Sequence, residues 1–326
     1  MFESVRENIL LLVSTPLYVI VIGLEILLSN YQNRKIYTWK DTLANIYLML
    51  LNSGIDLLFR SVYVVALVLA FNNRVGQINT PWVYWLVLIL SIDMMYYWLH
   101  RLEHEVRLFW AVHVTHHSSE HFNFTVGFRS SVFQPLYRFI FFMPLAFVGF
   151  KAVDILFIHS AIQTWGILVH TKMINKMGIL EWFLVTPSHH RVHHASNALY
   201  LDKNMGMLLI IWDKLFGTFQ PELSEQAYQP IRYGLTSNIE NPNAANLVLH
   251  EWKAIGQDLK KKIPLKTKLK YLFAPPGWSH DGSRKTSEQL RLAEAETLPS
   301  NEEKVALPVE SELVSAYAIS KKLSEK

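Results

Sequence analysis

The chain has 326 residues, of which 51% are hydrophobic and 18% charged, and its formal net charge is +4. The apolar excess is concentrated upstream of a polar C-terminal stretch, which excludes an ordinary soluble globule, and so small a charge makes nucleic acid a poor partner. There is no cysteine, which excludes disulfides, iron–sulfur clusters and thiolate nucleophiles. Any metal would therefore be held by histidine or carboxylate.

Three segments are long and apolar enough for membrane helices, which need roughly 20 mostly apolar residues. They are residues 8–28, 43–71 and 82–99. In the second, Asp56 and Arg60 are four residues apart and can neutralise each other on one helical face. Pro81 precedes the third, at a favoured first position of a helix. We interpret the first segment as an anchor, because a signal peptide would have a basic flank and a small-residue cleavage site.

Two further apolar segments, 132–150 and 152–169, are weaker and predict either two more spans or a re-entrant hairpin. The expected fold is an all-α, multi-pass membrane bundle of about four or five spans. Lysine and arginine are more frequent in loop 29–42 than in loop 72–80, and these residues favour the cytoplasmic side. With five spans, the 100–130 region and the C-terminus also lie there, so we expect a cytoplasmic cap of histidine-bearing helices.

Twelve of the fourteen histidines lie between His100 and His194. Eight of them form three groups, which are His100-x3-His104, His113-x2-His116-His117 and His190-x2-His193-His194. Histidines four residues apart share one helical face and can bind one metal ion, whereas a triplet can straddle two. Together the three groups suffice for two first-row ions, with positions left open for oxygen or water.

Helix geometry constrains how the first two groups can meet. In one continuous helix, His104 and His113 would lie about 14 Å apart on opposite faces. The sequence therefore predicts a break in the helix within residues 105–112. A separate helix for the third group is indicated by Thr186 as its N-cap and Pro187 as its first residue.

The remaining histidines are less informative. His170 ends the last apolar segment, which returns it to the level of the three groups, and it is a ninth candidate ligand. Three others, His121, His159 and His189, are ambiguous, and we expect His250 and His280 at the surface.

Competing metal chemistries fit the spacing less well. A zinc protease helix lacks its second histidine, because that position is Leu108. Haem needs only one or two axial histidines, and a catalytic zinc uses three protein ligands. A dinuclear centre that activates oxygen fits better. Iron suits imidazole ligands, while manganese and zinc stay open.

A family resemblance is carried by three stretches, WLHRLEHEVRLFWAVHVTHHSSE, TPSHHRVHHASNALYLDKNMGMLLIIWDKLFGTF and RYGLT. They are similar to the sterol desaturase and fatty acid hydroxylase superfamily, and within it to the alkylglycerol monooxygenases and their bacterial relatives. The resemblance covers about residues 40–240. It implies a membrane enzyme that uses two non-haem iron ions and O2 to hydroxylate a lipid C–H bond. Cleavage of an ether lipid is the candidate reaction and tetrahydrobiopterin a candidate reductant.

The resemblance also implies a set of metal ligands, which are His100, His104, His113, His116, His117, His190, His193 and His194, with His170 in addition. Glu105 follows the first group, as in the ether-lipid enzymes, and is the candidate catalytic residue. It could be a carboxylate ligand or an acceptor for an imidazole N–H. Asp202 and Asn204 are candidates for similar outer contacts, although roles in a turn are equally compatible with their residue types.

The predicted organisation has four parts. They are N-terminal membrane helices (1–72), a catalytic domain with the histidine groups (73–220), a basic segment at the membrane surface (221–278) and a polar tail that is disordered or loosely helical (279–326). The expected partners are a membrane lipid, the bilayer and an unidentified electron donor. Two alternatives stay open: a sterol or fatty-acyl hydroxylase or desaturase, and a histidine-based metal transporter, which would spread its ligands along the spans.

Overall fold

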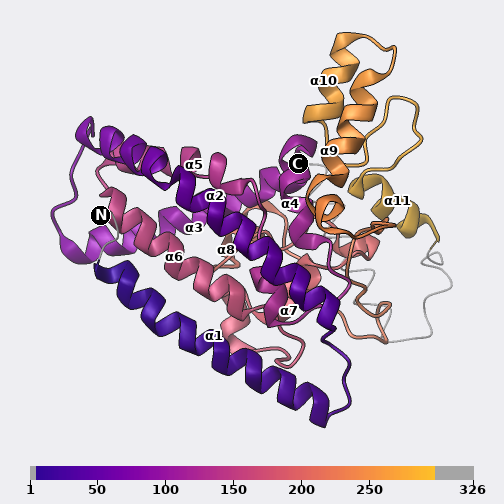
Figure 1. Ribbon diagram of the computed structural model, residues 1–326, viewed down its shortest axis with the longest axis horizontal. Coiled ribbons are helices and arrows are strands. Elements are labelled where there is room, and N and C mark those ends of the chain that lie inside the picture. The colour runs from indigo at the N-terminus through magenta and orange to yellow at the C-terminus, as the bar shows by residue number, and fades with distance from the viewer. Residues whose placement is uncertain (1–4, 298–326) are drawn as a thin grey trace.

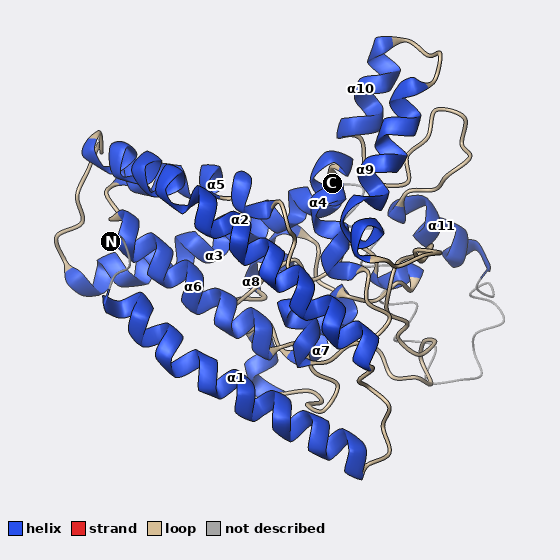
Figure 2. Ribbon diagram, viewed as in Figure 1, coloured by secondary structure: helices blue, strands red, loops and turns tan. Residues whose placement is uncertain are grey.

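The computed structural model describes residues 5–297. In this range all the regular secondary structure is helical, apart from two isolated β-bridges. Figures 1 and 2 show a bundle of long helices and, at one end of it, a cap of shorter helices. The all-α prediction is therefore confirmed.

The bundle contains three long helices and a shorter pair. They are α1 (Val5–Tyr31), α2 (Trp39–Asn72) and α3 (Pro81–Glu105), followed by α5 (Phe139–Val148) and α6 (Ala152–Leu168). Only the first three combine the length and apolar composition needed to cross a membrane among the described residues. Many of their apolar side chains point outward, such as Leu12 at 75% and Leu58 at 76% exposure. So large an exposed apolar surface suits lipid rather than water.

The α5–α6 pair forms a hairpin inside the bundle. Its turn lies beside the α2–α3 loop, since the Val75 N–H donates to the Phe147 carbonyl at 2.8 Å. At the same end, Arg6 pairs with Asp154 at 2.6 Å and joins α1 to α6. The hairpin therefore reaches the end of the bundle away from the histidines. Its first arm is helical only from residue 139, after the 3-10 helix η2 (Gln134–Leu136).

Several charged side chains within the bundle form ion pairs. The predicted pair Asp56–Arg60 is present at 3.9 Å. Arg60 also contacts Glu7 at 3.0 Å, and Asp56 accepts a hydrogen bond from Arg138. These contacts link α1, α2 and the start of α5, as expected for charges that must be neutralised away from water.

The cap is built from short helices after α3. They are α4 (Arg107–His117), α7 (Pro187–His193), α8 (Ile211–Phe216), α9 (Ala244–Lys260), α10 (Leu265–Phe273) and α11 (Ser287–Thr297), with the 3-10 helices η1 (Phe124–Phe128), η3 (Gly178–Trp182) and η4 (Ala198–Tyr200). The buried carboxylate of Asp93 in α3 accepts hydrogen bonds from the Leu208 and Leu209 N–H groups at 3.0 Å and from the Trp212 indole at 2.9 Å. This contact attaches the cap to the bundle.

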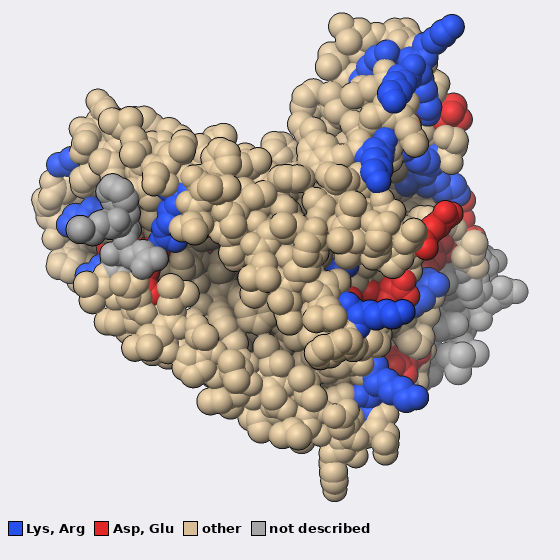
Figure 3. Space-filling view, in the orientation of Figure 1, with Lys and Arg blue, Asp and Glu red and all other residues tan. Residues whose placement is uncertain are grey.

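The C-terminal region contains the last three helices of the described residues. Figure 1 shows helices α9 and α10 projecting beside the bundle, and Figure 3 shows lysine and arginine gathered on one side of this projection. Within the predicted tail, which begins at residue 279, residues 287–297 form the helix α11, which packs against η4. The rest of the predicted tail, 298–326, lies outside the described residues.

Candidate metal centre

The predicted break in the helix is present. Helix α3 ends at Glu105 and α4 begins at Arg107, with an extended Val106 between them. The change of direction brings the first two histidine groups face to face, so that His100 Nε2 and His113 Nε2 are 3.0 Å apart. A continuous helix would have separated them by several turns.

The third histidine group starts its own helix, as predicted. Thr186 caps α7 and Pro187 is its first residue. The Thr186 N–H also donates to His189 Nδ1 at 3.3 Å, which completes a capping box. His189, ambiguous from sequence, therefore has a structural role in the start of α7.

All nine candidate ligands come together at the junction of bundle and cap. Group A consists of His100, His104, His113, His117 and His193, and group B consists of His116, His170, His190 and His194. Within each group the possible ligand atoms lie within 4.8 Å of one another. The groups adjoin, since the rings of His117 and His194 stack with centroids 4.4 Å apart. Both triplets divide between the groups, which is the straddling arrangement predicted from their spacing.

Several imidazoles are oriented by backbone carbonyls. The Nδ1–H groups donate from His100 to Met205 (2.8 Å), from His116 to Arg129 (2.9 Å), from His170 to Gly166 (2.7 Å) and from His193 to Lys203 (2.9 Å). Each of these bonds leaves Nε2 free to act as a metal ligand. The buried Nε2 atoms of His104 and His193 have no hydrogen-bond partner, which is costly unless an ion binds there.

The electrostatic setting keeps the cap histidines neutral. Burial, followed by the repulsion of neighbouring rings, lowers the pKa of His117, His193 and His194 well below the ordinary value. Burial lowers the pKa of His116 to about 4. Because a metal binds the neutral imidazole, these rings are in the required state at neutral pH.

Two carboxylates contact candidate ligands, and the predicted Glu105 is not one of them. Asp202 Oδ1 lies 3.2 Å from His104 Nδ1, and Glu103 Oε2 lies 3.2 Å from His113 Nδ1. Glu105 instead pairs with Arg101 at 2.7 Å, and its side chain is 44% exposed. The structure therefore does not bring Glu105 into either histidine group among the described residues, and its catalytic role stays a prediction.

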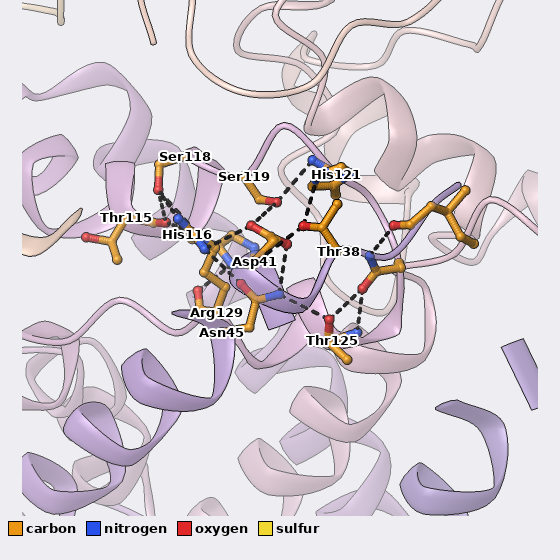
Figure 4. Close-up of polar contacts among 12 residues, drawn as sticks. Thr38, Asp41, Asn45, Thr115, His116, Ser118, Ser119, His121, Thr125 and Arg129 are labelled. Carbon is orange, nitrogen blue, oxygen red and sulfur yellow. Dashed lines mark hydrogen bonds and ion pairs between the residues drawn. The ribbon is translucent and has the colours of Figure 1, made fainter. Parts of the chain in front are cut away.

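A buried arginine supports group B from the side of α2. Arg129, only 2% exposed, donates to the Thr115 carbonyl at 2.9 Å and to Asn45 Oδ1 at 2.8 Å, and it lies 3.4 Å from Asp41. Figure 4 shows these contacts next to His116, whose ring donates to the Arg129 carbonyl. No sequence signal pointed to Arg129, because its partners Asp41, Asn45 and Thr115 are distant from it in sequence.

Two cavities reach the histidines from different sides. The bundle-side cavity, of about 210 Å³, is lined by His113, His116 and His170, by polar side chains such as Asn52, Gln134 and Gln163, and by apolar ones such as Phe128, Ile167 and Met207. The cap-side cleft, of about 590 Å³, is lined by His104, His117, His193, His194 and residues such as Trp110, Asp202, Ser283 and Arg284. The first cavity lies among the membrane-type helices, and the second is built largely from the cap.

The other histidines and Asn204 lie outside both groups. His159 is buried beside Tyr96 and Phe142 in the bundle. His121 contacts Thr38, and His280 is exposed, as expected. His250 is half-buried in the wall of the cap-side cleft. Asn204 has a φ of 55° and bonds to backbone groups only, which is a role in a turn.

The fold and these two groups define an integral membrane protein with a buried cluster of histidines suited to metal binding. Residues 85–218 match the model of the family described as "Fatty acid hydroxylase". They include every candidate ligand. No solved structure matches the chain.

Among curated proteins, the chain is similar to alkylglycerol monooxygenases and to a lathosterol oxidase. Alkylglycerol monooxygenase of Xenopus tropicalis is 36% identical over 278 residues, which are 81% of this chain and 58% of that protein. The Homo sapiens protein of the same name is 35% identical over 272 residues, which are 81% and 59% of the two chains. Lathosterol oxidase of Mus musculus is 27% identical over 188 residues, which are 53% and 59%. All these names describe oxidoreductases, and the chain spans little more than half the length of the relatives it matches.

Proposed function

We propose that this protein is a membrane-bound, O2-dependent lipid monooxygenase whose histidine groups A and B each hold one iron ion. The single observation that carries the proposal is the convergence of nine histidines into two adjacent groups. Within each group the possible ligand atoms lie within 4.8 Å of one another. A transporter would need ligands distributed along a path through the membrane. Here all of them gather at one level of the fold.

The residues fit such a pair of ions, and their task is positional. Iron bound there would supply the activation of O2 that attack on a C–H bond requires. Backbone carbonyls hold the rings in the correct tautomer, and burial keeps them neutral and excludes water. Overall, one oxygen atom of O2 enters the C–H bond, while the other leaves as water after uptake of two electrons and two protons.

An ether lipid is the substrate that the bundle-side cavity suits best. Its wall carries Asn52, Gln134 and Gln163 close to His113 and His116, so the carbon that reacts should lie next to hydrogen-bonding groups. The ether oxygen and hydroxyls of an alkylglycerol meet this requirement, whereas the apolar rings of a sterol and the middle of a fatty-acyl chain do not. Hydroxylation beside the ether oxygen gives a hemiacetal, which breaks down to an aldehyde and an alcohol.

The cap-side cleft is suited to the electron donor. It is reached from the cap, and Asp202, Ser283 and Arg284 offer hydrogen bonds while Trp110 offers a ring to stack on. A small polar reductant can therefore approach without entering the bilayer, and tetrahydrobiopterin is our candidate by resemblance. We place the cap in the cytoplasm, because the loop that precedes α2 at this end is richer in lysine and arginine than the α2–α3 loop.

The direct test is incubation of the purified protein in detergent with an alkylglycerol, tetrahydrobiopterin and ¹⁸O2. We expect a fatty aldehyde that carries ¹⁸O, measured by mass spectrometry after immediate reduction to the alcohol. A sterol and a fatty-acyl lipid are tested in parallel. Oxygenated product from one of these alone would replace the ether-lipid assignment, and unlabelled product from the alkylglycerol would contradict a monooxygenase.

Substitution of residues in the two cavities should separate the two co-substrates. Trp110→Ala is expected to raise the KM for tetrahydrobiopterin about tenfold, since aromatic stacking contributes about 0.5–1.5 kcal/mol beyond burial. Gln163→Leu should raise the KM for the alkylglycerol instead. Metal content is measured in both variants to confirm an intact centre. If both substitutions change the same KM, the assignment of the two cavities is wrong.

A further inference from the structure

The outer contacts of the histidines differ between groups A and B. In group A, two rings face carboxylates, with His104 opposite Asp202 and His113 opposite Glu103, each at 3.2 Å. In group B, His116 and His170 donate to backbone carbonyls at 2.9 and 2.7 Å. His190 has a buried Nδ1 without a hydrogen-bond partner.

The carboxylate of Glu103 is held firmly in its place. It is fully buried at 0% exposure and accepts hydrogen bonds from Gln134 at 2.8 Å and from the Tyr137 hydroxyl. His113 shares its Nδ1–H between Glu103 and Ser131, whose hydroxyl is 3.1 Å away. A buried carboxylate in this position favours positive charge on the other side of the ring, which is where the metal would bind.

These differences bear directly on metal affinity. A carboxylate acceptor makes an imidazole a stronger electron donor than a carbonyl acceptor does, and loss of such outer partners typically weakens metal binding 10- to 100-fold. Group A also has five possible ligands against four in group B. The ring of His190 lacks the outer bond that would select its tautomer. Each of these three features favours group A.

We infer that the two metal positions are unequal, with group A the tight site that fills first and group B the exchangeable site. This inference rests on the proposed function, since it presupposes two bound ions. Glu103 and Asp202 are then positioning residues that act through His113 and His104.

The test is anaerobic titration of the full-length, metal-free protein in detergent with Co²⁺, whose visible spectrum reports each step. We expect two binding steps whose dissociation constants differ at least tenfold. Glu103→Gln and Asp202→Asn should each weaken the first step about 10- to 100-fold and leave the second unchanged. His190→Ala should remove only the second step.

Controls separate these effects from misfolding. Glu240→Gln makes the same chemical change at an exposed residue and should leave both steps unchanged, and every variant is checked by size exclusion and thermal unfolding. A measurement on the unaltered protein is independent of the variants: a chelator should remove one ion quickly and the other slowly. Two ions bound or released in one indistinguishable step would overturn the inference and leave the proposed function standing. No binding by the folded protein would overturn both.

Discussion

Replacement of a single histidine in either group is expected to lower lipid oxygenation at least about a thousandfold. The proposed metal ions would contribute several kcal/mol of stabilisation to the reaction, and each 1.36 kcal/mol is a factor of ten in rate. His193→Ala removes a ligand from group A and His116→Ala one from group B. Iron content should fall from close to two per chain in the unaltered protein to about one or fewer in each variant, as measured by elemental analysis alongside the product assay.

A buried histidine outside the groups supplies the matched control. His159 lies in α6 with an Nε2 that has no hydrogen-bond partner, and His159→Leu replaces it with an apolar side chain of similar size. Because the change removes a buried, unsatisfied polar atom, stability should stay the same or rise slightly. Iron content and activity should be retained. Equal losses in His159→Leu and His193→Ala would mean that the assay reports general damage, and full activity in His193→Ala would exclude group A from catalysis.

The arrangement of the histidines was partly predictable, because helix geometry limits how they can meet. The break near Val106 follows from the requirement that His104 and His113 approach one another, which no continuous helix allows. The division of each triplet between two groups was also expected. The assignment of each histidine to group A or group B could not be predicted. It depends on the direction in which α4 leaves α3, and no local sequence signal encodes that direction.

Helix geometry alone could have distinguished Glu103 from Glu105. At about 100° per residue, Glu103 lies about 60° from His100 around the helix, whereas Glu105 lies about 140° away. Glu103 therefore shares the face of the histidines, and Glu105 turns toward Arg101. This arithmetic was sufficient to favour Glu103, but the family resemblance drew attention to Glu105. Arg129 offered no such signal, because its contacts join α2 to the end of α4.

Replacement of Arg129 is expected to cost about 3–5 kcal/mol of stability, as is typical when one partner is removed from a buried ionic contact. Arg129→Leu would remove the donor of the Asn45 amide oxygen. It would also take one partner from the Asp41 carboxylate, which keeps Ser119, and one from the Thr115 carbonyl, which keeps Ser118. The side-chain oxygen of Ser118, at 2.8 Å from Arg129 Nη2, would lose its contact as well. The measurement is unfolding of the purified protein in mixed micelles with increasing denaturing detergent.

The same substitution should also affect the metal centre, and selectively. The Arg129 carbonyl orients His116 of group B, so displacement of this segment should weaken the second metal-binding step about tenfold and spare the first. Arg129→Lys keeps the charge but cannot span all these partners at once, and an intermediate loss of stability is expected. Arg74→Leu, at an exposed arginine, should change stability by no more than about 0.5 kcal/mol. If Arg129→Leu is as stable as Arg74→Leu, the buried network of Figure 4 does not hold group B in place.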